Sequence, residues 1–457
     1  MTGFTSHIVE NGLLMKLLRL LFTMPVFAVF GLALIVRYFY NSKVARDYFP
    51  LHDSLTYQSI AYNILRDHCY CLLPHLQTVD RAPLWPALIA LVYGVLGPHD
   101  HIVRLLLSVV GSTTCVLIYC FAKDLFGRSV GLCIGLLATI YPFLFIYDGW
   151  LYSESVYTFL LLAFCYALYH QQRTPRWSLA VLSGILLGLL SLTRPNGLLI
   201  LSLCIVWAVA LGWRKLLSWR IVVQTTLAVS LISLVLIAPW TIRNFAVTHT
   251  LVPVAVGDGK VLLGAYNDMI LQRPYYLGIW IIPSESVPAV ARQFPANCAD
   301  ACEVRRDNTY RYYAEQWMLS HLAAMPYLLG LHLVNMWQVT SQEADLAINR
   351  FPERDTSHLV VAMMEILTPI VFALAALGLI VTRKYWRELL LIYLMITLTI
   401  VQCIALYGIP RFRAPIEPML LILAGGAIRW VATIQQGLPR NFTDSLEPPA
   451  EMCIKKT

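Results

Sequence analysis

Long apolar runs recur along the chain and are separated by short polar segments. A helical run of about 20 apolar residues matches the roughly 30 Å hydrocarbon thickness of a bilayer. We expect about ten spans, and up to thirteen if shorter apolar segments also cross. The ten are residues 19–38, 101–122, 129–147, 150–169, 177–192, 197–213, 221–240, 359–381, 388–408 and 414–433. The pattern predicts an all-α, polytopic membrane protein.

Lys and Arg cluster in alternate connections between these runs, as the positive-inside rule requires. If the amino end lies inside, the inner connections carry Lys123, Arg128, Arg173, Arg176, Arg214, Lys215, Arg220, Arg383, Lys384 and Arg387. Two large segments, residues 39–100 and 241–358, then lie outside. This predicts a multi-pass protein of the plasma (inner) membrane whose site is on the outer, periplasmic side.

Three stretches in the outer segments are helical in pattern but poorly suited to span. Residues 54–66 place apolar positions at helical spacing, which indicates an amphipathic helix on the membrane surface. Residues 83–96 are apolar but short, so we expect a second interfacial helix. Residues 321–340 are interpreted as interfacial or re-entrant, because a further span there would move the basic cluster at 383–387 outside.

Composition excludes a water-soluble enzyme. Only 13% of the 457 residues are charged and 58% are hydrophobic, whereas soluble domains carry about 25% charged residues. The net charge of +8 reflects the basic connections and does not indicate nucleic-acid binding. The eleven cysteines do not form a disulfide framework in so long a chain, although Cys298 and Cys302 could pair in an oxidising compartment.

Asp53 and Arg81 are the most informative polar residues of the first outer segment. Asp53 starts the first surface helix, where it either caps the free N–H groups or serves as a base. Arg81 precedes the second surface helix and either anchors at the interface or contacts an anion. His52 and Tyr57 lie close to Asp53 in the sequence and are secondary candidates.

Further candidates lie at the outer ends of the predicted spans. Glu154 is an ionisable residue in an apolar segment, which is costly and points to function, and Asp148 precedes it. Four arginines at outer ends could converge on a phosphate, because guanidinium groups fit phosphate oxygens: Arg194, Arg243, Arg411 and Arg413. His99 and His101 are weak candidates for a divalent metal, and the metal requirement stays open.

These motifs, in this order, resemble the membrane-embedded GT-C glycosyltransferases of the protein-mannosyltransferase and aminoarabinose-transferase type. They are an Asp followed by a Tyr-containing surface helix (53–65), Arg-x-Pro-Leu-x-Pro (81–86), Tyr-Pro (141–142), Ser-Glu (153–154), Thr-Arg-Pro (193–195) and Pro-Trp-x-x-Arg-Asn (239–244). The resemblance covers roughly residues 15–250, with the Arg-Phe-Arg-Ala-Pro turn as a weaker match further on. It implies a GT-C bundle that moves a sugar from a polyprenyl-phosphate carrier to a lipid, glycan or protein acceptor.

The resemblance also implies roles for single residues. Asp53 matches the family's catalytic carboxylate, Glu154 a second site carboxylate, and Arg81 a cation that contacts the donor phosphate. The aminoarabinose-transferase type has a Lys where this chain has Arg81. The first outer segment lacks the Asp-Glu pair of protein mannosyltransferases, which argues against a protein acceptor.

The competing hypothesis is a transporter or flippase of lipid-linked sugars, which would also combine many spans with intramembrane charges. No internal repeat supports it, and no nucleotide-binding motif is present.

The predicted spans and outer segments divide the chain into four parts. They are a catalytic membrane module (1–240), an outer region for substrate or acceptor recognition (241–358), carboxy-terminal spans (359–433) and a cytoplasmic tail (434–457).

Overall fold

A computed structural model describes residues 24–272, 277–295, 297–339 and 355–435. The first five residues of the predicted span 19–38 and nearly all of the predicted tail 434–457 lie outside the described residues.

The predicted all-α architecture is confirmed. Each of the ten predicted spans coincides with a helix: α2 (Pro25–Phe39), α5 (Asp100–Phe126), α6 (Arg128–Ile140), α7 (Glu154–Arg173), α8 (Trp177–Thr193), α9 (Gly197–Trp213), α10 (Trp219–Thr248), α17 (Asp355–Val381), α18 (Trp386–Ala405) and α20 (Glu417–Gln435). Helix α2 continues as a π-helical turn, η1 (Tyr40–Val44).

The number of spans stays a prediction. Six of the described helical stretches, which include α2, α5, α10, α17, α18 and α20, are long and apolar enough to cross a bilayer alone. Helices α15 (Ala301–Ser320) and α16 (Met325–Met336) would add a seventh if they formed one span, but they meet at a bend of 118°. That bend falls in the predicted re-entrant stretch 321–340.

The predicted span 129–147 is wrong in its second half. Helix α6 ends at Ile140, and the next residues form two short 3-10 turns, η2 (Pro142–Leu144) and η3 (Ile146–Gly149). Pro142 explains the break, because proline disfavours helical backbone in the residue before it and cannot donate to a preceding carbonyl. Helix α7 then starts only at Glu154, which is therefore the first residue of a helix.

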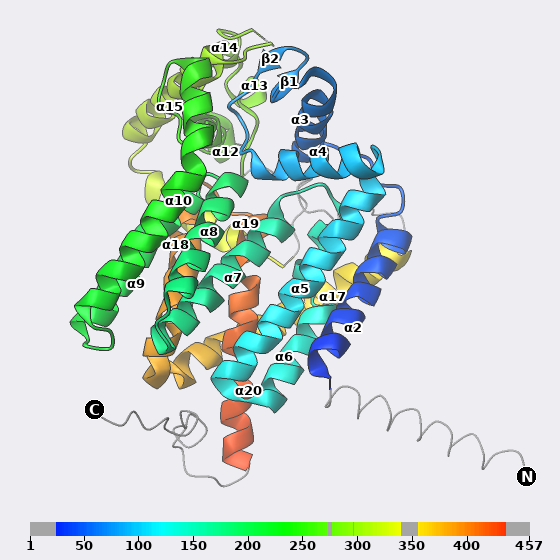
Figure 1. Ribbon diagram of the computed structural model, residues 1–457. Helices are drawn as coiled ribbons and strands as arrows, with labels where there is room; N and C mark the ends of the chain where they lie inside the picture. The colour runs from blue at the N-terminus through cyan, green and yellow to red at the C-terminus, as the bar shows by residue number, and fades with distance from the viewer. Residues whose placement is uncertain (1–23, 273–276, 296, 340–354, 436–457) are drawn as a thin grey trace, which may run out of the picture.

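A cap of short elements covers one end of the bundle (Figure 1). The first outer segment supplies α3 (Asp53–Asp67), the antiparallel strands β1 (Cys71–Leu73) and β2 (Leu76–Gln77), and α4 (Leu84–Leu96), which lies across the bundle end. The second supplies α11 (Asp258–Ala265), α12 (Asp268–Gln272), α13 (Pro283–Ser286), α14 (Pro288–Ala291) and α15. The two predicted surface helices are thus present as α3 and α4.

Disulfides tie both outer segments. The predicted Cys298–Cys302 bond is present, and a second bond, Cys69–Cys71, was not anticipated from the sequence. The first joins the loop before α15 to the first turn of that helix, and the second lies at the start of β1.

Glycines allow neighbouring spans to approach closely. A Cβ on Gly131 of α6 would lie 2.8 Å from the backbone of Lys123 in α5. A Cβ on Gly184 of α8 would lie 2.8 Å from Ile232 in α10. The second contact fixes α8 against α10, and Arg194 directly follows α8.

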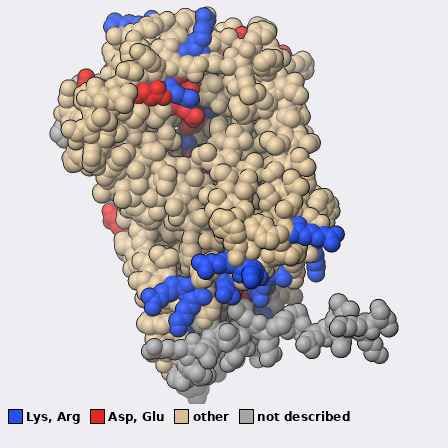
Figure 2. Space-filling model, turned by 90° about the vertical axis from the view of Figure 1, so that its left-hand side faces the viewer, with Lys and Arg blue, Asp and Glu red and all other residues tan. Residues whose placement is uncertain are grey.

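The two ends of the bundle differ in charge. Figure 2 shows acidic and basic side chains together at a hollow near the upper end of one face, and mainly basic side chains towards the lower end. Helix α7 illustrates the separation, because it begins with Glu154 and ends with Arg173, 20 residues and roughly 30 Å away.

Candidate active site

Asp53 is held between two arginines from distant parts of the chain. Its Oδ1 accepts a hydrogen bond from Arg81 Nη2 at 3.0 Å, and its Oδ2 accepts one from Arg411 Nη2 at 2.8 Å. Asp53 is the first residue of α3, where the free N–H groups and the helix dipole favour a negative charge. Arg81 lies just before α4, and Arg411 lies in α19 (Pro410–Arg413), before the last described helix.

Glu154 extends this arrangement towards the bundle interior. Its Oε1 accepts from Arg194 Nη2 at 2.5 Å and from Arg411 Nε. Arg194 also donates from Nε to Ser153 Oγ at 3.0 Å. Arg411 therefore bridges the two carboxylates, and the five residues form one continuous set. We call Asp53, Arg81, Glu154, Arg194 and Arg411 the site network.

One end of the network is partly exposed to solvent and the other end is buried. The side chains of Asp53 and Arg81 are 30% and 20% exposed, whereas that of Glu154 is 1% exposed. Three buried polar atoms around it have no hydrogen-bond partner among the described residues: Arg81 Nε, Glu154 Oε2 and Asn196 Oδ1. Buried polar atoms are normally paired, so these unsatisfied groups indicate a place for a polar ligand.

The arginines keep Asp53 ionised. Burial alone would raise the pKa of the Asp53 carboxyl, but the charges of Arg411 and Arg81 outweigh it and hold the pKa below its ordinary value. Burial, with a smaller contribution from Asp53, raises the pKa of Tyr57, which lies one turn further along α3 and stays a neutral hydroxyl.

Aromatic rings orient two of the arginines. The guanidinium of Arg411 lies 4.1 Å from the ring centroid of Tyr152, and that of Arg194 lies 5.7 Å from the ring of Tyr157. Stacking on an aromatic face limits the motion of a guanidinium while leaving its N–H edge available.

Arg243, predicted as a phosphate contact, lies outside the network. It donates to the backbone oxygens of Thr78 at 2.8 Å and Tyr70 at 3.2 Å, and its guanidinium lies 4.9 Å from the ring of Trp240. In this structure Arg243 fastens the first outer segment to the C-terminal end of α10.

Arg413 and Asp148 are also placed elsewhere. Arg413 is fully buried, pairs with Glu417 at 2.5 Å and donates to the Met336 backbone oxygen. Asp148 is fully buried and pairs with Arg37 at 2.7 Å. Both arrangements hold helices together and neither contacts Asp53.

The remaining predicted candidates are not part of the network. His52 precedes α3 with a left-handed φ of 51° and is exposed. The rings of His99 and His101 lie 5.3 Å apart. Within the described residues, no group of three or more His, Cys, Asp or Glu side chains is arranged to hold a metal ion.

Two acidic residues near the network were missed by the sequence reasoning. Asp80 Oδ2 accepts from Arg81 Nη1 at 2.6 Å, so Arg81 is shared between two carboxylates. Glu303, in α15, hydrogen-bonds to Thr78 and Val79. The adjacency of Asp80 to Arg81 was a usable signal, whereas nothing in the sequence connects Glu303 to a segment more than 220 residues earlier.

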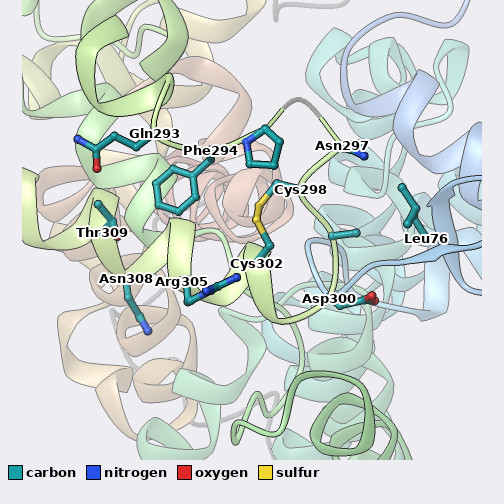
Figure 3. Close-up of a pocket in the computed structure, with 12 residues that line it drawn as sticks. Leu76, Gln293, Phe294, Asn297, Cys298, Asp300, Cys302, Arg305, Asn308 and Thr309 are labelled. Carbon is teal, nitrogen blue, oxygen red and sulfur yellow. A yellow bond between two sulfur atoms is a disulfide. The ribbon is translucent and has the colours of Figure 1, made fainter.

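A cavity of about 700 Å³ lies in the outer cap, away from the network (Figure 3). Its walls come from α15, the loop closed by the Cys298–Cys302 bond, and Leu76 of β2. Amide, hydroxyl and guanidinium groups line it, together with one phenyl ring: Gln293, Asn297, Asn308, Thr309, Arg305 and Phe294.

Comparison with known proteins relates the chain to membrane glycosyltransferases. The family model for dolichyl-phosphate-mannose-protein mannosyltransferase matches residues 80–242. No curated protein sequence matches the chain. The matched segment contains Arg81, Glu154 and Arg194 of the network, but neither Asp53 nor Arg411.

Solved structures match over nearly the whole chain. The archaeal oligosaccharyltransferase AglB from Archaeoglobus fulgidus, in complex with an inhibitory peptide and a dolichol-phosphate, has a TM-score of 0.55 at 12% identity. The alignment covers 94% of this chain and 53% of that one. The same enzyme tethered to an acceptor peptide has a TM-score of 0.54 at 11% identity, with 91% and 50% covered.

A third structure, ArnT from Cupriavidus metallidurans bound to undecaprenyl phosphate, is 13% identical and covers 89% of this chain and 78% of that one. Its TM-score of 0.40 is too low to establish a shared fold. The chain thus spans about half the length of the oligosaccharyltransferase, and the predicted GT-C fold is confirmed.

Proposed function

We propose that the protein is an integral-membrane glycosyltransferase that moves a sugar from a polyprenyl-phosphate carrier to an acceptor on the outer face of the membrane. The observation that carries the proposal is Asp53, an ionised and partly exposed carboxylate held between Arg81 and Arg411. A base and phosphate-binding cations are the two components that this transfer needs.

The arginines suit the donor. The matched family is described by its dolichyl-phosphate-mannose substrate, and AglB was solved with a dolichol-phosphate. A phosphate at the open end of the network would meet Arg81 first, because Arg81 is partly exposed and its Nε has no partner. Guanidinium groups stabilise a leaving phosphate more strongly as its charge grows in the transition state.

Asp53 cannot accept a proton while both of its oxygens face guanidinium groups. We infer that donor binding draws Arg81 and Arg411 from Asp53 to the phosphate, since a phosphate competes for the same N–H donors. The acceptor oxygen then attacks the anomeric carbon, its proton passes to Asp53, and the bond from the anomeric carbon to the phosphate oxygen breaks. Polyprenyl phosphate leaves with the electron pair.

We assign acceptor recognition to the outer region 241–358. The cavity beside α15 supports this assignment, because amide and hydroxyl groups around one phenyl ring suit the hydroxyls and apolar faces of sugars. Its volume of about 700 Å³ falls in the usual range for ligand pockets.

The charge distribution supports an outer-face reaction. Basic residues outnumber acidic ones at the end of α7 that carries Arg173, where Asp124 pairs with Lys123, and the positive-inside rule assigns such an end to the cytoplasm. The network at the start of α7 then faces outward. In a bacterial cell this corresponds to the periplasmic side of the inner membrane.

The test is an assay of carrier release. Purified protein in liposomes is given synthetic polyprenyl-phosphate sugars and a panel of lipid, glycan and peptide acceptors, and free polyprenyl phosphate is measured. We expect release by the wild type and a loss of about 1000-fold in Asp53→Asn, because a carboxamide cannot take the proton. Asp258→Asn is the matched control, since Asp258 is also the first residue of a helix in the outer cap and is 77% exposed.

A flippase is the alternative function. If the wild type never consumes carrier but moves labelled lipid-linked sugar across the liposome bilayer, the transferase proposal is wrong.

A further inference from the structure

Glu303 is a buried carboxylate of the second outer segment that accepts hydrogen bonds from the first outer segment. It lies in the first turn of α15 and is 2% exposed. Its Oε1 accepts from Thr78 Oγ1 at 2.8 Å, and its Oε2 accepts from the Val79 backbone N–H at 2.7 Å. It forms no ion pair with any described Lys, Arg or His within 4.0 Å.

These bonds continue directly to the site network. Thr78 Oγ1, which donates to Glu303, accepts from the backbone N–H of Asp80 at 3.1 Å. Asp80 then pairs with Arg81, and Arg81 pairs with Asp53. Three residues, Thr78, Asp80 and Arg81, therefore separate Glu303 from Asp53.

Besides its bonds to Tyr70 of the first outer segment, the segment between β2 and Arg81 is held by the second outer segment and by the end of α10. The backbone N–H of Asp300 donates to Gln77, Arg243 donates to Thr78, and the backbone N–H of Val256 donates to Val79. Among these contacts, only Glu303 reaches both Thr78 Oγ1 and the Val79 N–H, the two groups that fix the turn into Asp80.

A buried carboxylate without a direct ion pair lowers the stability of the folded protein, so its presence here needs an explanation. Burying a charge without a counter-ion is unfavourable, and two neutral donors compensate only in part. Asp80 adds repulsion, and the nearby charges of Arg306 and Arg243 offset part of it without a direct ion pair. A simple packing role would be served better by an amide or an apolar side chain.

We propose that Glu303 is a positioning residue that fixes Thr78 and Val79 so that Asp80 directs the Arg81 guanidinium at Asp53 and the donor phosphate. This inference rests on the proposed glycosyltransferase function. It assigns to the second outer segment a part in the donor site, in addition to the acceptor role proposed above. Glu303 itself touches no reacting atom.

The experiment compares Glu303→Ala with Asp307→Ala in the full-length protein. Asp307 is a matched control, because it lies one turn further along α15, is 5% exposed, does not line the cavity assigned to the acceptor and accepts a backbone N–H, that of Lys260, at 3.1 Å. For both variants, kcat and KM for the polyprenyl-phosphate sugar are measured, together with thermal stability. We expect kcat/KM of Glu303→Ala to fall about 10- to 100-fold, as misplaced groups typically cause, and Asp307→Ala to stay within twofold of wild type.

A second variant covers the case in which Glu303→Ala does not fold. Thr78→Val keeps the side-chain shape but removes the hydroxyl that links Glu303 to Asp80, so we expect it to lower kcat/KM about 10-fold. Glu303→Gln retains one acceptor and is expected to recover part of the lost activity. Equal losses in Glu303→Ala and Asp307→Ala, or full activity in folded Glu303→Ala and Thr78→Val, would overturn the proposal.

Two readouts do not depend on transferase activity. Hydrogen exchange of residues 69–82 should rise in Glu303→Ala and not in Asp307→Ala. Binding of undecaprenyl phosphate, used as the probe, should weaken only in Glu303→Ala. If the wild type transfers no sugar, the proposed function fails, while unchanged exchange in Glu303→Ala would separately refute the positioning role.

Discussion

Two neighbouring sets of arginine and carboxylate side chains differ in their exposure and in their hydrogen bonding. One is the site network, which includes Glu154; the other is the pair Arg37–Asp148, which also binds Ser155, the residue after Glu154. Both join residues that are far apart in the chain, and both lie among apolar helices. They differ in how completely their hydrogen bonds are satisfied.

The Arg37–Asp148 pair is shielded from solvent, and both of its side chains make further hydrogen bonds. Both side chains are 0% exposed, Arg37 also donates to the backbone oxygen of Leu144 at 2.7 Å, and Ser155 donates to Asp148. The site network is partly exposed at Asp53 and leaves Arg81 Nε and Glu154 Oε2 without partners. Partial exposure together with unpaired polar atoms, rather than the presence of charge, therefore distinguishes the candidate site from the Arg37–Asp148 pair.

Among the changes that compare the two sets, the largest effect should come from Arg411, which touches both carboxylates of the network. Arg411→Ala leaves Asp53 and Glu154 without their shared cation and removes a donor from the leaving phosphate. We expect kcat/KM to fall about 100- to 1000-fold, with Arg411→Lys intermediate because an ammonium cannot span both carboxylates. Carrier release measures this. Arg176→Ala, an exposed cation at the opposite end of the bundle, is the control and should leave the rate unchanged.

Asp148→Asn should separate stability from activity. It leaves Arg37 buried without its counter-ion, which costs about 3–5 kcal/mol. The thermal midpoint and the yield of folded protein should fall, while kcat per folded molecule stays at the wild-type value. If instead kcat collapsed in a normally stable Asp148→Asn, the two sets would belong to one site.

A smaller effect should appear with pH, because Glu303 is buried without the arginine partner that Asp148 has. Burial, and then the charge of Asp80, raises the pKa of Glu303 from 4.5 to about 7. A raised pKa favours the folded state at low pH, and this contribution is lost as pH rises through about 7. The thermal midpoint should therefore drop by a few degrees between about pH 5.5 and 8 in wild type and by less in Glu303→Gln. The pKa of Asp53 is held below its ordinary value, so Asp53 adds no slope in this window.

Sequence patterns were sufficient to predict these helices, because the length and hydrophobicity of an apolar run depend only on the residues within that run. Hydrophobic length located all ten, and the error at residues 141–147 arose where Pro142 interrupts an otherwise continuous apolar run. The hairpin β1–β2 is only a few residues long and has no comparable signal.

The candidate site could be predicted only in part. Asp53, Arg81, Glu154, Arg194 and Arg411 were all singled out, and the structure brings them into contact. Arg413 was named by the same reasoning, yet it lies two residues from Arg411 and pairs with Glu417. Which of two nearby arginines faces a ligand depends on helix packing across the whole chain. The contact of Glu303 with Thr78 and Val79 could not be predicted for the same reason, because it joins segments far apart in the sequence.

The contact between Asp53 and Arg411 joins residues 358 positions apart. At a synthesis rate of about 5–20 residues per second, the ribosome needs roughly 20 to 70 seconds to make the intervening chain. Arg81, Glu154 and Arg194 are synthesised within that interval, before the cation that bridges the two carboxylates exists. The nascent protein therefore cannot form the complete network, and the site matures only when the translocon receives the segment that carries Arg411.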